Sequence, residues 1–275
     1  MIARLHRVWW GLRQESSWGW RELATGRLRW QIDVIAYRAM AFPSVARYYK
    51  KHELDRFRVL KTKSGVTLYY RTNRGDIQGI REIFIDEIYR LPEHVKVTGL
   101  VDLGANIGLA TVWLATTYGL TGVIAVEPLP ENTRLLRTNV RANNIACQVI
   151  EAAVGTTTGV TYFAETSESN LGHVADAGRE IPLIDVREIV NELSFSDPLL
   201  KMDIEGMEGE LLQSIDPVWT RKFVAMVMEM HPAIVNVGEL VQIISAQGFD
   251  YRDSYETTKG YRRSKRERLF VRQEI

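Results

Sequence analysis

A glycine-containing segment, Val101-Asp-Leu-Gly-Ala-Asn-Ile-Gly108, carries the first residues whose types and spacing could do chemistry. An apolar run leads into this segment and a helical pattern follows it, so the segment is a strand-to-helix turn. Glycines let a backbone bend sharply and approach a ligand without a Cβ in the way. In an open parallel sheet, ligands bind at the carboxyl ends of the strands. The sequence therefore predicts a nucleotide-binding turn formed by Asp102, Gly104, Asn106 and Gly108.

The spacing of the glycines restricts the ligand. A dinucleotide site requires G-x-G-x-x-G, but Asn106 and Leu109 stand where this motif has its second and third glycines. A phosphate loop of the form G-x-x-x-x-G-K-[ST] is also absent. The turn therefore fits a nucleoside without phosphates, such as an adenosine linked to a methionine-like tail, and argues against a nicotinamide-dependent oxidoreductase.

An acidic residue, Glu127, stands at the end of the second predicted strand and is followed by Pro128. A carboxylate about twenty residues beyond a glycine turn can hydrogen-bond the diol of a ribose. The alternative is a solvated acid at a strand end. The spacing favours the ribose contact.

Three further residues are candidates for a general base. Asp203 and Glu205 end the fourth predicted strand, and His231 ends the fifth. A base within hydrogen-bond reach can take the proton of a reacting hydroxyl, and a histidine has a pKa near neutrality. Each has an alternative role, because Asp203 could hold an amino group, Glu205 could cap the next helix and His231 could bond to backbone. We expect the cluster to line the site and leave the choice of base open.

A metal site is an alternative for the acidic residues of this region. Oxygen ligands from Asp203, Glu205 and Glu229 would suit Mg²⁺. Nothing in their spacing requires a metal ion, and the neighbouring Lys201 argues against one. We predict no metal.

Two polar segments have both a functional and a structural interpretation. Residues 165–173, with Asn170 and His173, form either a loop that closes over a substrate or a surface loop without that role. The basic run at residues 259–266 is usually a solvated loop. If functional, it would receive a phosphate-bearing substrate or an acidic carrier protein.

Alternating strands and helices must position these residues from Val97 onward. The sequence predicts strands at residues 97–103, 122–126, 147–154, 199–204, 223–230, 249–255 and 268–273, and helices at residues 109–118, 130–142, 185–193, 209–215 and 237–247. This order predicts an α/β fold with a mostly parallel sheet covered on both faces.

The first ninety residues differ from the rest of the chain in composition and sequence pattern. This region is rich in tryptophan, with Trp9, Trp10, Trp18, Trp20 and Trp30. Apolar residues at positions 31–40 have helical spacing. A β-hairpin is predicted at residues 57–71 and a helix at residues 76–91, closed by Pro92. We expect a helical arm that packs on the main core, with a lid, a dimer contact or a membrane-surface helix as alternatives. The expected domains are residues 1–90 and 91–275.

The bulk composition excludes several classes of protein. A formal net charge of +1 over 275 residues gives no global field for nucleic acid or an anionic membrane. No run of about 18 uncharged apolar residues is present, so we predict no membrane span. The one cysteine, Cys147, cannot form an intrachain disulfide, which is typical of a reducing cytoplasm. Its apolar surroundings predict a buried, inert thiol.

Three blocks of sequence together resemble the FkbM family of S-adenosylmethionine-dependent methyltransferases. They are the turn at residues 101–108, Val126-Glu-Pro128, and Leu200-Lys-Met-Asp-Ile-Glu-Gly-Met-Glu208, which is the most specific. Ala152-Ala-Val-Gly155 is a supporting match. The resemblance covers roughly residues 76–270 and implies a Rossmann-like class I methyltransferase fold, with a seven-stranded sheet whose last strand is antiparallel.

The resemblance also implies a cofactor and a reaction. S-adenosylmethionine would be the methyl donor, and the acceptor would be a hydroxyl of a small molecule or sugar, as in natural-product tailoring. A nucleic-acid methyltransferase and a non-catalytic cofactor-binding module are the alternatives. We predict no nucleic-acid partner and leave a homodimer open. The residues expected to contact the cofactor are Asp102, Gly104, Ala105, Asn106, Gly108, Glu127, Pro128, Ala153 and Asp203.

Overall fold

The computed structural model describes residues 44, 56–72, 75–164, 173–175, 178–204, 207–213, 219–230, 236–252 and 267–273. The chain divides into two compact units, Met1–Ile85 and Asp86–Ile275, and each is described by itself. The tryptophan-rich arm and the helix predicted at residues 31–40 lie outside the described residues. Within the described part of the chain, no helix combines the length and apolar character that crossing a membrane requires.

The first unit contains the predicted hairpin and a helix. Strands β1 (Phe57–Lys61) and β2 (Thr67–Arg71) pair antiparallel, which confirms the hairpin. Helix α5 (Asp76–Phe84) is tied to β2 by a buried ion pair in which Arg71 Nε lies 2.9 Å from Asp76 Oδ2. The predicted extension of this helix to residue 91 is wrong. Glu87 has a left-handed φ of 53°, which an α-helix cannot continue through.

A seven-stranded sheet forms the centre of the second unit. Its order is β12-β13-β11-β10-β3-β4-β5. The strands are β3 (Gly99–Leu103), β4 (Gly122–Val126), β5 (Cys147–Ile150), β10 (Pro198–Met202), β11 (Ala225–Glu229), β12 (Phe249–Arg252) and β13 (Glu267–Arg272). Only β13 runs against its neighbours, so the predicted mostly parallel sheet with an antiparallel last strand is confirmed. The strand order reverses beside β3, and ligands bind at the carboxyl ends of strands at such a point.

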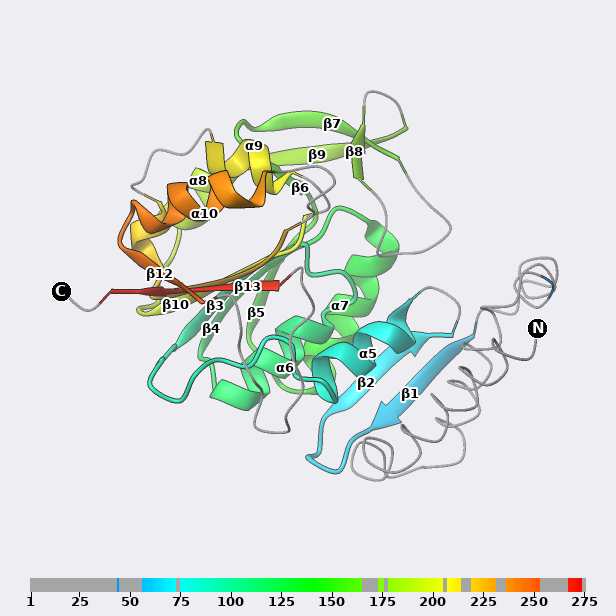
Figure 1. Ribbon diagram of the computed structural model, residues 1–275. Helices are drawn as coiled ribbons and strands as arrows, with labels where there is room; N and C mark the ends of the chain where they lie inside the picture. The colour runs from blue at the N-terminus through cyan, green and yellow to red at the C-terminus, as the bar shows by residue number, and fades with distance from the viewer. Residues whose placement is uncertain are drawn as a thin grey trace. The chain divides into compact units, whose positions relative to one another are not determined.

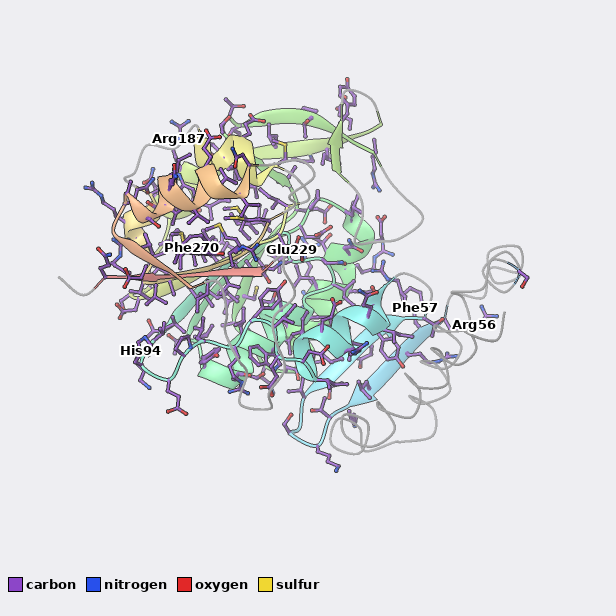
Figure 2. The ribbon with its side chains drawn as sticks, in the orientation of Figure 1. Arg56, Phe57, His94, Arg187, Glu229 and Phe270 are labelled. Carbon is purple, nitrogen blue, oxygen red and sulfur yellow. The ribbon has the colours of Figure 1, made fainter. Side chains whose placement is uncertain are left out.

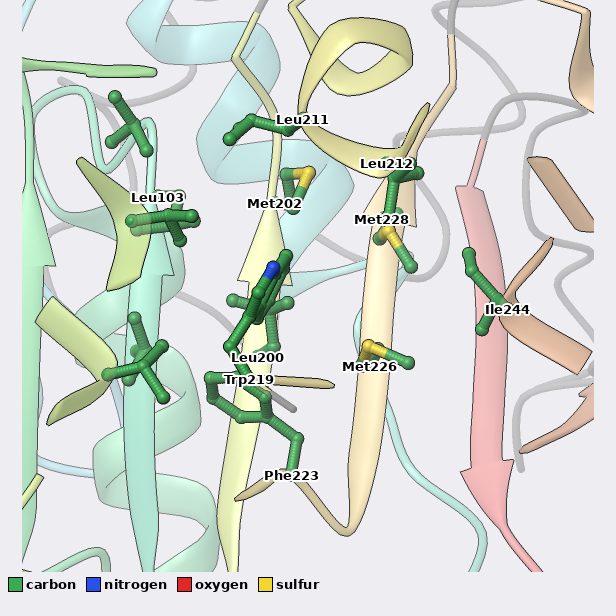
Figure 3. Packing of buried hydrophobic residues seen from close by; sticks show 14 of the residues in the cluster. Leu103, Leu200, Met202, Leu211, Leu212, Trp219, Phe223, Met226, Met228 and Ile244 are labelled. Atoms are coloured by element: carbon green, nitrogen blue, oxygen red, sulfur yellow. The ribbon is translucent and has the colours of Figure 1, made fainter. Parts of the chain in front are cut away.

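Helices cover both faces of this sheet (Figure 1). Helices α6 (Leu109–Tyr118) and α7 (Pro130–Ala142) lie on one face, and α8 (Val186–Asn191), α9 (Glu208–Gln213) and α10 (Val237–Ser245) lie on the other. A short 3₁₀ helix spans Thr220–Lys222. Alternate residues of the central strands, among them Leu103, Met202 and Met228, pack in one buried cluster with Leu211 of α9 and Ile244 of α10 (Figure 3). The strand residues between them therefore face α6 and α7.

A second, four-stranded sheet was not predicted. The strand expected at residues 147–154 is interrupted after Ile150, and β6 (Ala153–Gly155) joins a different sheet of order β6-β9-β7-β8. Its other strands are β7 (Gly159–Ala164), β8 (His173–Ala175) and β9 (Arg179–Asp185). Antiparallel pairing of β7 with β9 stabilises strands in a segment whose polar, glycine-rich sequence favours loops.

The cysteine is less buried than predicted. Cys147 begins β5 and is only partly buried. Burial, reinforced by the nearby Asp102 carboxylate, raises the pKa of its thiol to about 12. The thiol therefore stays protonated at neutral pH, which agrees with the predicted lack of reactivity.

Candidate functional site

The glycine turn after β3 depends on backbone conformations that favour glycine. Gly104 has a φ of 79° and Gly108 has a φ of 82°. A Cβ on Gly104 would lie 1.8 Å from the backbone oxygen of Asp203, so only a glycine lets the ends of β3 and β10 approach. The Gly104 and Ala105 amides both donate to the Val126 carbonyl, at 3.0 and 2.9 Å. The turn is therefore held between the ends of β4 and β10.

A buried ion pair lies directly beneath this turn. Asp102 and Lys201 are register partners in β3 and β10, so both side chains project toward the face covered by α6. Lys201 Nζ lies 3.1 Å from Asp102 Oδ1, and the two side chains are 3% and 0% exposed. Thr111 of α6 donates to Asp102 Oδ2 at 2.6 Å. Lys201 also donates to the Gly104 carbonyl at 2.7 Å, which links the pair to the turn.

The charges around Lys201 keep its ammonium group protonated. Burial by itself would lower the pKa of Lys201. The negative charges of Asp102, Asp203 and Glu229 outweigh burial and raise this pKa above its ordinary value. The Tyr89 ring, whose centroid lies 5.9 Å from Nζ, adds a cation–π contact. Because three carboxylates act on a single ammonium group, negative charge remains at this end of the site. This end therefore suits a further cationic group.

The predicted ribose-binding carboxylate has a different environment. Glu127 is 5% exposed and follows β4 directly. Its Oε2 accepts from the Asn106 amide at 2.8 Å, and its Oε1 accepts from the Leu129 amide at 3.1 Å and from Asn132 Nδ2 at 2.9 Å. Burial raises the pKa of Glu127 to about 7, against the opposing effect of these hydrogen bonds and of the Lys201 charge. The carboxyl group therefore stands near its titration midpoint at neutral pH.

The structure brings together most of the residues predicted to contact a cofactor. Asp203 follows β10, is half-buried, and its amide donates to the Leu103 carbonyl at 3.0 Å, so it stands beside the turn. Pro128 follows Glu127 and is half-buried. Ala153 lies in β6 instead, in a small apolar cluster with Leu129 and Ile181.

The predicted bases are only partly covered by the structure. Glu205 and His231 lie outside the described residues, as does Asn170. For His173 the backbone is described, and it pairs with Ala164. Glu229 ends β11 and is half-buried (Figure 2). Among the described residues, no group of three His, Cys, Asp or Glu side chains is placed to hold a metal ion.

Two residues at this site were missed by sequence reasoning. Lys201 carried a signal, because a charged residue inside an apolar strand is rarely buried without a partner. Asn132, in the first turn of α7, carried no signal that distinguished it from an ordinary helix residue. Together with Asp102 and Glu127 they form two adjoining polar regions. One has fixed charges around an ammonium, and the other has a carboxyl group that meets mainly neutral donors.

Comparisons with known proteins show the family of this chain. Residues 102–251 match the family described as the methyltransferase FkbM domain. The chain is similar to the 31-O-demethyl-FK506 methyltransferase FkbM of Streptomyces tacrolimicus, with 26% identity over 234 residues, which cover 71% of this chain and 90% of that protein. It is also similar to Methyltransferase 1 of Beauveria bassiana, with 23% identity over 163 residues, which cover 50% of this chain and 66% of that one.

Among solved structures, the chain is similar to a methyltransferase FkbM from Methylobacillus flagellatus KT. The sequence identity is 15% and the TM-score is 0.45. The match covers 73% of this chain and 61% of that one.

Proposed function

Since this chain belongs to the FkbM family of S-adenosylmethionine-dependent methyltransferases, we propose that it methylates a hydroxyl group of a small molecule or a sugar. The observation that carries this proposal is the similarity to the 31-O-demethyl-FK506 methyltransferase, 90% of which is covered by the alignment. The name of that protein describes methylation of an oxygen. A role in natural-product tailoring is the extension of this proposal.

The residues at the glycine turn fit the methyl donor. S-adenosylmethionine supplies a methyl group that is already activated by its sulfonium. Glu127 retains acceptor capacity for a ribose hydroxyl, because its Oε2 accepts only one hydrogen bond from the described residues. The buried amide oxygen of Asn106 has no hydrogen-bond partner among the described residues, which suits a ligand donor. The carboxylates of Asp102 and Asp203 suit the donor's ammonium group.

Two tasks remain for the chain once the donor is bound. The first is to hold the acceptor oxygen in line with the methyl group, and such positioning can supply about 7–11 kcal/mol. The second is to take the proton from the hydroxyl, which is worth about 10²–10⁴-fold in rate. Asp203, Glu205 and His231 are the candidates for this base. The remaining predicted contacts, Gly104, Ala105, Gly108, Pro128 and Ala153, are assigned to donor binding.

The acceptor itself is defined only by class. A neutral hydroxyl compound, a phosphate-bearing substrate and a carrier-bound substrate each fit the proposal. The basic run at residues 259–266, which would receive an anionic group, lies outside the described residues. A homodimer stays a prediction.

Binding and turnover experiments test the proposal in two stages. Calorimetry on the full chain with S-adenosylmethionine, S-adenosylhomocysteine and NAD should show binding of the two sulfur ligands and none of NAD. Incubation with S-adenosylmethionine and a panel of alcohols, sugars and amines should then give methyl ethers by mass spectrometry. Products methylated only on nitrogen or carbon would contradict the proposed O-methylation.

The base is identified by separating binding from turnover in D203N and H231A variants. Loss of the base should lower kcat by about 10²–10⁴-fold while the Kd for S-adenosylhomocysteine stays unchanged. If D203N instead weakens binding of this ligand, Asp203 holds the amino group. Unchanged kcat in both variants would leave Glu205 as the base.

A further inference from the structure

Asn132 is a buried polar residue beside the proposed ribose-binding carboxylate. It lies in the first turn of α7 and is 1% exposed. Its Nδ2 donates to Glu127 Oε1 at 2.9 Å. Its Oδ1 is buried and has no hydrogen-bond partner within the described part of the chain. One half of this amide is therefore engaged by the protein and the other half is not.

The orientation of the Asn132 amide follows from its partner. In its ionised form Glu127 only accepts hydrogen bonds, and its Oε1 already accepts from the Leu129 amide, so the nitrogen of the Asn132 amide faces this oxygen. The opposite orientation would set two acceptor oxygens against each other. Oδ1 is thus held next to the carboxylate by the same contact that satisfies Nδ2, and a buried acceptor without a donor costs free energy.

Asn106 and Asn132 both donate to Glu127, and each also carries an acceptor oxygen with remaining capacity. Among the described residues, Glu127 Oε2 accepts only from the Asn106 amide, and the side-chain oxygens of Asn106 and Asn132 accept no hydrogen bond. A ligand that satisfies them must bring hydroxyl or amino donors. A ribose brings two adjacent hydroxyls, which match a carboxylate and a neighbouring amide oxygen.

We propose that Asn132 is a second ribose-binding residue, whose amide oxygen accepts a hydrogen bond from one hydroxyl of the cofactor while Glu127 accepts from the other. The amide nitrogen of Asn132 at the same time fixes the orientation of the Glu127 carboxylate. This inference rests on the proposed function, in which Glu127 contacts the ribose.

The test compares ligands that lack one hydroxyl. The Kd values of S-adenosylhomocysteine and of its 2′-deoxy and 3′-deoxy analogues are measured by calorimetry for the full-length chain and for N132L and N132A. In the unsubstituted chain, removal of the hydroxyl bound by Asn132 should weaken binding about tenfold, as expected for one hydrogen bond. In N132L and N132A this penalty should fall to about twofold or less, while the penalty for the other hydroxyl is retained.

Asn139 provides the matched control. It lies on the same helix and is also buried, but its Nδ2 donates to the Ile107 carbonyl at 2.8 Å and not to Glu127. An N139L variant removes a buried asparagine of the same size and should keep both hydroxyl penalties. Circular dichroism establishes that each variant is folded, and the smaller N132A substitution supplies the answer if N132L is not.

The outcomes separate this inference from the proposed function. If the unsubstituted chain does not bind S-adenosylhomocysteine, the cofactor assignment itself fails. If it binds, and both Asn132 variants keep the two hydroxyl penalties of the unsubstituted chain, Asn132 does not contact the ribose. Equal loss of both penalties would show that Asn132 acts only by holding Glu127, which also overturns the proposed direct contact.

Discussion

Two buried carboxyl groups, Asp102 and Glu127, stand at the ends of neighbouring parallel strands, and the chain surrounds them differently. Asp102 is paired with the Lys201 ammonium at 3.1 Å and accepts a hydrogen bond from Thr111. Glu127 accepts from two backbone amides and one side-chain amide, and burial raises its pKa to about 7. For Glu127, the hydrogen-bond donors and the charge of Lys201 offset the effect of burial only in part.

In the proposed function, Asp102 lies near the ammonium group of S-adenosylmethionine and Glu127 lies near its ribose. The group beneath the turn is a fixed set of charges that the protein itself compensates through Lys201. In the proposed function, hydroxyl donors of the ligand supply the remaining hydrogen bonds of the carboxyl group at the end of β4. Substitutions at the partners of Asp102 and Glu127 test whether their surroundings cause this difference.

The largest effect is expected from removing the counterion of Asp102. A K201M variant leaves this carboxylate buried without its cation and should lower the free energy of unfolding by about 3–5 kcal/mol. Urea denaturation at neutral pH measures this change. The double variant K201M/D102N removes both charges and should recover most of the loss. Equal stability of K201M and the unsubstituted chain would show that Asp102 does not depend on Lys201.

The pH dependence of stability tests the environment of Glu127. Its pKa is about 7 in the folded chain against an ordinary value of 4.5. Between these pH values the folded state holds a proton that the unfolded state has lost, so the free energy of unfolding falls as pH rises through this window. The total fall is about 3 kcal/mol, and it should be absent in E127Q.

Urea denaturation at a series of pH values from 5 to 8 measures this slope, and E151Q is its control. Glu151 is a more exposed acid whose pKa is lowered, first by the Thr133 hydroxyl, so its titration lies below this window. E151Q should keep the slope of the unsubstituted chain. A slope in E127Q equal to that of the unsubstituted chain would mean that Glu127 ionises normally.

A smaller effect is expected from removing the hydroxyl that supports Asp102. Thr111 donates to Oδ2 of this carboxylate at 2.6 Å inside the core. T111V should cost about 1.5–3 kcal/mol, the range for a hydrogen bond to a charged group. Thr116 of the same helix donates to the neutral carbonyls of Val112 and Trp113, so T116V should cost about 1 kcal/mol or less. Equal effects in thermal or urea unfolding would contradict the special role of the charged partner.

The smallest effect is expected from a charge pair near the surface. Arg137 Nη1 lies 3.1 Å from Glu151 Oε2, and the two side chains are 40% and 36% exposed. Solvent screens this pair, so R137M should change the free energy of unfolding by less than about 1 kcal/mol. Unfolding in low and high salt measures it. A loss as large as that of K201M would undermine the distinction between buried and exposed pairs.

Local patterns predicted the elements of the main sheet well. Helices α6 and α7 and strand β4 have the predicted bounds, residues 109–118, 130–142 and 122–126. Left-handed glycines at both ends of α6, and a proline at the start of α7, mark these limits in the sequence itself. After β5 ends at Ile150, the chain leaves the main sheet and β6 pairs with β9 in the second sheet. This sheet depends on the pairing of β7 with β9, which no short segment encodes.

The residues of the candidate site also fall into two groups: some are predicted from local sequence, and others depend on tertiary contacts. Asp102, Gly104 and Glu127 are recognised because turn chemistry and spacing are local properties of a strand-turn-helix unit. The contacts of Lys201 depend on the register of β10 against β3, which joins residues 97 positions apart at the Gly104 carbonyl. The contact of Asn132 depends on how the first turn of α7 faces the end of β4.

By itself, the sequence determined that this chain folds as an α/β protein with a glycine turn after a central strand, and its motifs indicated the methyltransferase family; the ribose contact of Glu127 stays a prediction. The tertiary structure alone decided that one buried acid receives a cation and the other receives amides. The physical reason is that ionisation depends on burial and on the nearest charges. Those neighbours are brought together by strand register and helix packing over distances in sequence that no local pattern spans.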